Sequence, residues 1–137
     1  MNRMLLIFLI FICSTNLALS STTSYDRYGQ KTGSYKQNGA IINHYNRYGQ
    51  KIESYKKTSN GYNSYGRNGS KIGSYKKTSS GYDSYDSYGG KIESYKTSGN
   101  TTTIYDKYGR KTGSYKTDSS GKIIHYDKYG RTVETYK

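Results

Sequence analysis

The chain has 137 residues and a formal net charge of +13; only 31% of its residues are hydrophobic, and 19 are tyrosine. Leu, Phe, Met, Trp, Pro and Cys are all absent after residue 20, which excludes an ordinary aliphatic core and any disulfide in that part of the chain. Low aliphatic content with high charge is also typical of disordered chains. The regular spacing of the tyrosines instead favours a repetitive fold in which tyrosine supplies the core.

Residues 1–20 have the pattern of a secretory signal peptide. Arg3 gives a short basic start, residues 4–13 form an apolar run, and the small residues Ala18 and Ser20 precede the expected cleavage point. The alternative is a single membrane anchor, but the apolar run is shorter than the roughly 20 residues that a spanning helix needs. We therefore expect an exported protein, periplasmic, cell-surface or secreted, with no transmembrane segment after cleavage.

Residues 21–137 form one domain of six tandem copies of a sequence about twenty residues long. A fixed short period indicates one small unit stacked on itself and excludes most enzyme folds. Each copy starts with a tyrosine, and these lead residues are Tyr25, Tyr45, Tyr65, Tyr85, Tyr105 and Tyr126.

A tight turn is predicted at the start of every copy. In the first copy, Asp26 followed three residues later by Gly29 fits a type I turn closed by a glycine with positive φ. The Asp carboxylate can accept hydrogen bonds from nearby backbone N–H groups, and Asn46 has the same capability in the second copy. The residues expected to build these turns are Asp26, Gly29, Gly49, Gly69, Gly89, Asp106, Gly109, Asp127 and Gly130.

A strand is expected after each turn, because Thr, Ile or Val and then Tyr are favourable strand residues. The expected strands cover residues 31–36, 51–56, 71–76, 91–96, 111–116 and 132–137. A polar stretch then leads to a second short strand, such as residues 122–126. The predicted fold is all-β, with six β-hairpin repeats forming an antiparallel meander or β-solenoid. No capping element is visible, so we expect open sheet edges that would support self-association.

A second rhythm has a period of two copies. The third position of the strand after each turn alternates between glycine and glutamate: Gly33, Glu53, Gly73, Glu93, Gly113 and Glu134. One interpretation places glycine where backbones approach closely and glutamate where a lysine is near. The other is the duplication of an ancestral forty-residue pair.

The hairpin cores resemble the bacterial RHS/YD repeats. Residues 105–110 and 126–131 both read Tyr-Asp-Lys-Tyr-Gly-Arg and match the Tyr-Asp-x-x-Gly-Arg core of that family. Copies one and four keep Tyr-Asp-x-x-Gly with Gln30 or Gly90 in place of the arginine, copy two has Asn46, and copy three departs most. The resemblance implies a β-hairpin architecture in an exported bacterial protein. It does not imply toxin delivery, because the chain is too short to form the shell that such repeats build.

Charge and tyrosine together indicate a binding function. Only Arg3 among the 22 basic residues lies in the first twenty positions and no acid does, so residues 21–137 carry about +12. Such a surface attracts anionic polysaccharide, lipopolysaccharide or extracellular nucleic acid, while tyrosine rings stack on sugars or bases. The candidate binding residues are Lys31, Lys51, Lys71, Lys91 and Lys111 with Tyr35, Tyr55, Tyr75, Tyr95 and Tyr115. The alternative is that these tyrosines are themselves the core and that the lysines only keep the sheet soluble.

Catalysis is not expected. The aspartates are explained by turns, and His44 and His125 occupy an ordinary strand position of repeats far apart in the sequence. No cofactor or metal motif is found in the sequence. The function expected is a non-catalytic module of the cell envelope or cell surface that binds anionic polymers. A self-assembling surface fibre is the alternative, and a secreted effector acting on a host is a third class.

Overall fold

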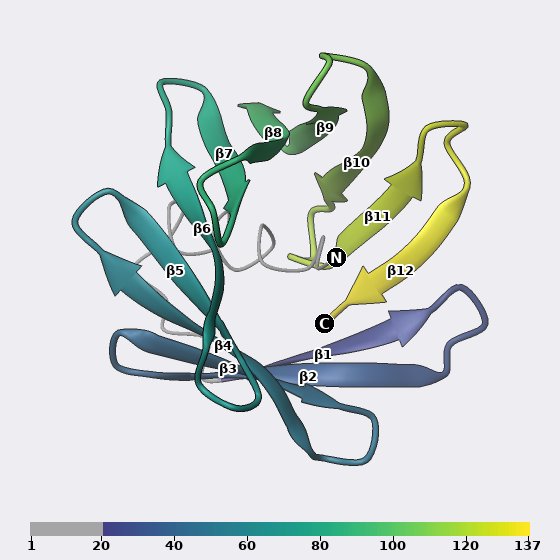
Figure 1. The fold of residues 1–137 in the computed structure, drawn as a ribbon. Helices are drawn as coiled ribbons and strands as arrows, with labels where there is room; N and C mark the ends of the chain where they lie inside the picture. The colour runs from purple at the N-terminus through teal and green to yellow at the C-terminus, as the bar shows by residue number, and fades with distance from the viewer. Residues whose placement is uncertain (1–20) are drawn as a thin grey trace.

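The computed structural model describes residues 21–137, so the predicted signal peptide lies outside the described residues. These residues form twelve strands and six hairpins (Figure 1), which confirms the all-β, antiparallel prediction. The strands are β1 (Ser21–Asp26), β2 (Lys31–Asn38), β3 (Ile41–Asn46), β4 (Lys51–Thr58), β5 (Gly61–Gly66), β6 (Lys71–Lys77), β7 (Gly81–Asp86), β8 (Lys91–Ser98), β9 (Thr101–Asp106), β10 (Lys111–Thr117), β11 (Ile123–Asp127) and β12 (Thr132–Tyr136).

The sheet closes into a barrel. Each strand pairs with its neighbours in sequence, and β1 also pairs antiparallel with β12, where Tyr25 lies opposite Thr135. Two backbone hydrogen bonds between Thr23 and Lys137, of 2.8 and 3.0 Å, extend this seam. The predicted antiparallel meander is confirmed. The prediction of a solenoid with open sheet edges is wrong, because the accumulated twist brings the first and last hairpins together (Figure 1). Self-association stays a prediction, but it has no open edge of the barrel to use.

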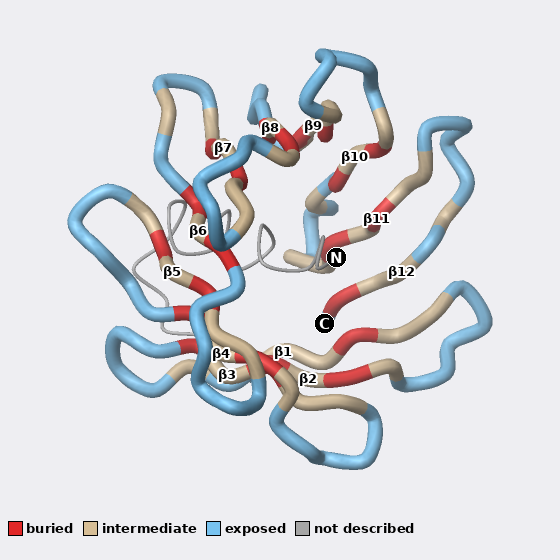
Figure 2. Tube along the Cα trace, viewed as in Figure 1, coloured by how far each residue is buried: buried red, intermediate tan, exposed pale blue. Residues whose placement is uncertain are grey.

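Side chains alternate between the interior and the outside, as the two-residue period of a strand requires. In β4, Glu53 and Tyr55 are buried, while Lys56 beside them is exposed. The buried positions lie within the strands, and most residues of the connections at both ends are exposed (Figure 2). The hydrophobic core consists of tyrosine and isoleucine alone: Tyr35, Ile42, Tyr55, Tyr62, Tyr75, Tyr82, Tyr95, Ile104, Tyr115, Ile123 and Tyr136.

A shift in register occurs in every hairpin, just before the lead tyrosine. In the first hairpin the shift falls between Ser24 and Tyr25, so that Ser24 pairs with Gly33 and Tyr25 with Lys31. The extra residue in β2 is Thr32, and its counterparts recur in the other five hairpins. Such bulges bend a strand and increase its local twist, which helps a sheet curve into a barrel.

The hairpin turns have the structure expected from the sequence. In the first, the Gly29 N–H donates to the Asp26 carbonyl at 3.0 Å, and Gly29 has φ of +80°. The Asp26 N–H donates to the carbonyl of Gln30 at 2.9 Å. The equivalent glycines in the other hairpins have φ between +79° and +86°, a region that L-residues rarely adopt.

All six of these turns lie at the same end of the barrel, because each one connects an odd-numbered strand to the next even-numbered strand. We call this end the turn rim, which comprises residues 26–31, 46–51, 66–71, 86–91, 106–111 and 127–132. The connections from even to odd strands, such as that between β2 and β3, form the opposite end. Six turns of the same type are thus gathered into a ring, and one further turn of this type, from Asp118 to Gly121, lies at the opposite end. Among the described residues, no helix has the length and apolar character needed to cross a membrane.

Replacing Gly109 by alanine is expected to destabilise the barrel by about 1–2 kcal/mol, the cost of a Cβ in the left-handed region. A Cβ at this position would meet no atom within 4 Å, so the loss would come from the backbone conformation and not from a clash. Urea unfolding followed by circular dichroism measures the change. Gly109→Asn should lose less, because asparagine tolerates this conformation better. An alanine variant as stable as the parent would contradict the assigned turn.

Candidate functional site

The turn rim carries the most exposed aromatic side chains among the described residues. In five of the six hairpins, the second tyrosine of the Tyr-Asp-x-Tyr-Gly motif, with Asn46 replacing Asp in the second hairpin, lies within the turn and is at least 70% exposed. These residues are Tyr28 (73%), Tyr48 (80%), Tyr88 (97%), Tyr108 (71%) and Tyr129 (70%). An isolated exposed tyrosine needs no explanation, but five on one rim form a repeated surface.

The backbone around each rim tyrosine is held by the preceding acid or amide. In the first turn, Asp26 Oδ1 accepts hydrogen bonds from the backbone N–H groups of Tyr28 and Gln30, both at 2.9 Å. Asn46 Oδ1 makes the same two bonds in the second turn, both at 3.0 Å. The turn therefore has a defined conformation, although the tyrosine ring points into solvent.

Cations lie against several of these rings. The Arg27 guanidinium is 4.8 Å from the centroid of the Tyr28 ring. Tyr108 has both Lys107 and Arg110 beside it, at 5.0 and 5.3 Å, and in the last turn Lys128 and Arg131 lie 4.8 and 5.2 Å from the Tyr129 ring. Such contacts combine an aromatic surface with positive charge at one point.

Two of the rim arginines are also oriented by ion pairs. Arg110 Nε donates to Asp106 Oδ2 at 2.8 Å, and Arg131 Nε donates to Asp127 Oδ2 at 2.7 Å. The backbone N–H groups of the same arginines, with smaller contributions from their side chains, lower the pKa of both carboxyl groups. Each pair is exposed and adds little to stability, but it restrains the guanidinium group next to the neighbouring tyrosine.

The lysines singled out in the sequence come together at this rim. Lys31, Lys51, Lys71, Lys91 and Lys111 are all exposed and start the strands that leave the turns. Lys91 differs from the others because its Nζ lies 2.8 Å from Asp83 Oδ2 on the outer wall. The structure thus places the five lysines on the turn rim, and four of them, all but Lys71, follow a turn that carries an exposed tyrosine.

The tyrosines singled out in the sequence lie elsewhere. Tyr35, Tyr55, Tyr75, Tyr95 and Tyr115 are at most 8% exposed and point into the barrel. A polymer on the outer surface cannot stack on them. These five tyrosines are part of the core, as the alternative interpretation of the sequence stated. Their period is the same as that of the rim tyrosines, and the candidates taken from the sequence are the buried set. The available signal was the position of Tyr28 and its equivalents between Asp and Gly in a tight turn, which forces a side chain into solvent.

The outer wall below the rim repeats the pairing of tyrosine with lysine. Lys76 Nζ is 4.8 Å from the centroid of the Tyr85 ring, and Lys96 Nζ is 5.3 Å from that of Tyr105. Similar contacts join Lys36 to Tyr45 and, across the seam between β1 and β12, Lys137 to Tyr25. The lead tyrosines are half-buried, so this belt extends the cationic surface but presents less aromatic area than the rim.

The alternating glycine and glutamate positions face the interior. A Cβ at Gly73 would lie 2.6 Å from the Tyr85 carbonyl oxygen, so glycine is required there by a close backbone approach, which was one of the two interpretations of the alternation. At the alternate position, Glu93 accepts a hydrogen bond from the Tyr95 hydroxyl at 2.6 Å. Desolvation, and then nearby tyrosine and glutamate, raise the pKa of Tyr95 well above its usual value.

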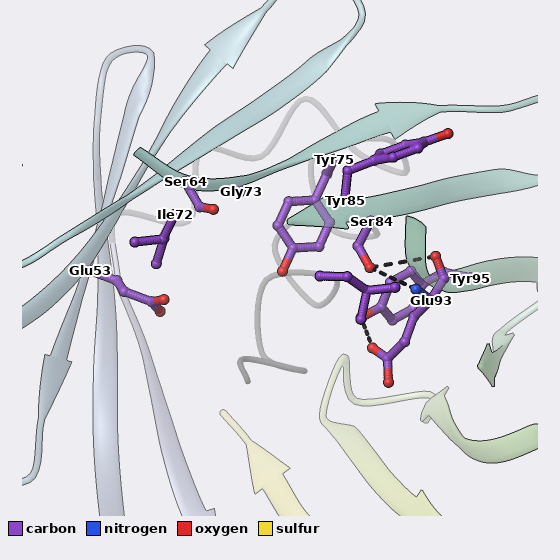
Figure 3. Close-up of a pocket in the computed structure, with 10 residues that line it drawn as sticks. Glu53, Ser64, Ile72, Gly73, Tyr75, Ser84, Tyr85, Glu93 and Tyr95 are labelled. Carbon is purple, nitrogen blue, oxygen red and sulfur yellow. Dashed lines mark hydrogen bonds between the residues drawn. The ribbon is translucent and has the colours of Figure 1, made fainter. Parts of the chain in front are cut away.

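A small pocket of about 50 Å³ opens around Gly73 in this part of the barrel, with Glu53 and Glu93 on opposite sides of Tyr75 (Figure 3). Its size admits water and not a sugar or a nucleotide. The pocket therefore belongs to the interior packing and is not a polymer-binding site.

The two histidines are accounted for by packing. His44 lies directly opposite Tyr35 in the neighbouring strand, and their rings stack with centroids 4.3 Å apart. His125 stacks on Tyr115 in the same way at 4.4 Å. Within residues 21–137, no group of three or more His, Cys, Asp or Glu side chains is placed to hold a metal ion.

Comparison of the chain with models of known protein families finds no match, and neither does comparison with curated protein sequences. The resemblance of the turns to RHS/YD repeats therefore stays a prediction. A function can therefore be inferred only from the residues exposed on the turn rim.

Stability in acid is expected to depend on Asp106 and Asp127. Because folding lowers the pKa of both carboxyl groups, their contribution is present above the unfolded-state pKa, near 3.8, and is lost as pH falls through the folded-state values. The double variant Asp106→Asn/Asp127→Asn should keep the hydrogen bonds within each turn, because an asparagine Oδ1 accepts the equivalent two bonds in the second turn, at Asn46. Its unfolding free energy should therefore fall less than that of the parent between about pH 5 and pH 2. If chemical denaturation showed the same fall in unfolding free energy for the variant and the parent over this pH range, this role would be contradicted.

Proposed function

We propose that this protein is a non-catalytic, exported module of the cell envelope or cell surface that binds anionic polymers through its turn rim. The observation that carries the proposal is the gathering of exposed tyrosines and cations at one end of the barrel. Neither feature alone would be sufficient, because scattered surface lysines and tyrosines are common on proteins of this composition.

The charge distribution supports this end of the molecule. The turn rim holds twelve of the 21 basic residues of positions 21–137 and four of the nine acids, so about +8 of the net +12 is concentrated there. Its basic residues are Arg27, Lys31, Arg47, Lys51, Arg67, Lys71, Lys91, Lys107, Arg110, Lys111, Lys128 and Arg131. Three of the remaining acids, Glu53, Glu93 and Glu134, lie on inward-facing strand positions and do not offset the rim.

Repetition makes a polymer the appropriate ligand. A single exposed contact between a cation and an anion contributes up to about 1 kcal/mol, and a cation–π pair at the surface contributes a similar amount. A polymer that carries the same group many times can engage several turns at once, and linked weak contacts give high avidity. A small anion would engage one turn and bind weakly.

Binding without catalysis fits the state of the rim carboxylates. Asp26, Asp86, Asp106 and Asp127 are each engaged by backbone N–H groups of their own turns, and two of them also hold arginines. A carboxylate held in this way acts as a brace and is poorly suited to accept a proton from a substrate. Export is supported by the signal-like residues 1–20 and by the absence of cysteine from positions 21–137.

The proposal is tested by two triple variants with the same loss of charge. Arg27→Gln/Arg47→Gln/Lys128→Gln removes three rim cations, and Lys57→Gln/Lys77→Gln/Lys122→Gln removes three at the opposite end. Binding to single-stranded DNA, lipopolysaccharide and an acidic polysaccharide is measured over a salt series. For the DNA, the slope of log K against log salt should fall by about 2 in the rim variant, because each lost contact removes about 0.7.

The opposite-end variant should keep a slope near that of the parent for all three polymers. Equal losses in the two variants would reduce the interaction to overall charge and would contradict binding at the rim. Binding of none of the three polymers by the parent protein at about 0.15 M salt would refute the proposed function itself.

A further inference from the structure

The six turns of the rim are not equivalent. Four of them combine an exposed tyrosine with a basic residue directly before it: Arg27–Tyr28, Arg47–Tyr48, Lys107–Tyr108 and Lys128–Tyr129. The third turn has Asn68 in place of the tyrosine. The fourth has Ser87 before Tyr88, and its Lys91 is held by Asp83 on the wall. Two adjacent turns therefore lack one component each.

Closure of the barrel makes the four complete turns neighbours. In sequence they form two separate pairs, one in the first two hairpins and one in the last two. Because β1 pairs with β12, the last hairpin lies beside the first, as the purple and yellow hairpins in Figure 1 show. The four turns form one uninterrupted arc centred on the seam, which we call the seam arc: residues 107–110, 128–131, 27–30 and 47–50.

The spacing of the arc selects among anionic polymers. Successive turns are two strands apart, which is about 10 Å at the barrel wall. This spacing suits a chain with one acidic group per disaccharide, as in an extended polysaccharide of alternating neutral and uronic acid sugars. Stacked nucleotides place a phosphate about every 3.4 Å along a strand, so most phosphates would fall between turns. Duplex DNA is in addition too stiff to follow an arc of this curvature.

The ring faces also favour a sugar carboxylate over a base. Nucleobases bind single-strand-binding surfaces by stacking on open aromatic faces. In the seam arc, Tyr108 and Tyr129 each have two cations within 5.3 Å of the ring centroid. Because Arg110 and Arg131 bond to the turn aspartates through Nε, the terminal nitrogens of both guanidinium groups are directed away from those carboxylates and can grip a planar carboxylate.

We propose that the seam arc binds an acidic glycan with one carboxylate per disaccharide, one disaccharide to each of its four turns. This inference rests on the proposed function, since it names the ligand class and the sector of the same rim. Hairpins three and four complete the barrel and do not contribute to the main contact.

The test uses hyaluronan oligosaccharides of increasing length, with the intact protein, in isothermal titration calorimetry. Affinity should rise with each added disaccharide up to the octasaccharide and then level off, because the arc has four complete turns. Tyr108→Ser/Tyr129→Ser should weaken octasaccharide binding by about tenfold, since the two rings that position the lysine and arginine of these turns are lost. The matched variant Tyr88→Ser, outside the arc, should change it by less than about twofold.

Each failure has a separate meaning. Affinity that continues to rise beyond the octasaccharide, or an effect of Tyr88→Ser as large per residue as that of the arc variant, would overturn the seam arc. Tighter binding of oligothymidylate than of hyaluronan, with the same dependence on the arc tyrosines, would overturn the ligand class and leave polyanion binding at the rim intact. If the parent protein bound no anionic polymer, the proposed function itself would be refuted.

Discussion

The pairing of β1 with β12 is the contact on which the rest of the structure depends. It is a short seam of three directly opposed residue pairs and two flanking backbone hydrogen bonds between Thr23 and Lys137. Without it, six hairpins of tyrosine, serine and lysine would leave two unsatisfied edges and an interior open to water. With it, each interior tyrosine gains neighbours on both sides, and no strand of the barrel has a free edge.

Closure also creates the candidate site. An antiparallel meander sends all six turns that follow a lead tyrosine to one end, so a chemical feature repeated about every twenty residues along the chain becomes a ring at that end of the barrel. The bracing of the turns by Asp or Asn holds their tyrosines in solvent beside arginine or lysine. The seam then joins the two best-equipped pairs of turns, which are far apart in sequence. The surface proposed to bind glycan is thus a product of fold and not of any one repeat.

Local structure could be predicted from the sequence because short-range chemistry determines it. The Asp-x-x-Gly spacing dictated the turns, and the polar stretches after Tyr35 and its equivalents marked the ends of the hairpins. Closure could not be predicted, because it depends on twist summed over twelve strands and on six bulges at residues such as Thr32. The facing of the tyrosines depends on the pairing of the strands: Tyr35 lies opposite Thr22 and Gly33 opposite Ser24 on the inner face, so Tyr25, one residue after Ser24, faces outward. The five tyrosines singled out in the sequence are buried as a result of this pairing, whereas the five lysines singled out with them are exposed on the rim.

The most direct test of this account is a disulfide across the seam. Tyr25 and Thr135 lie opposite each other on β1 and β12, so Tyr25→Cys/Thr135→Cys, in a Cys13→Ser background, should oxidise to a bond within one chain. Tyr25→Cys/Tyr65→Cys is the control, since β5 is separated from β1 by three strands. Mass spectrometry after mild oxidation should find the intramolecular bond in the first variant only. Free thiols, or bonds formed only between chains, in the seam variant would show that the sheet is open and would contradict both the barrel and the arc built on it.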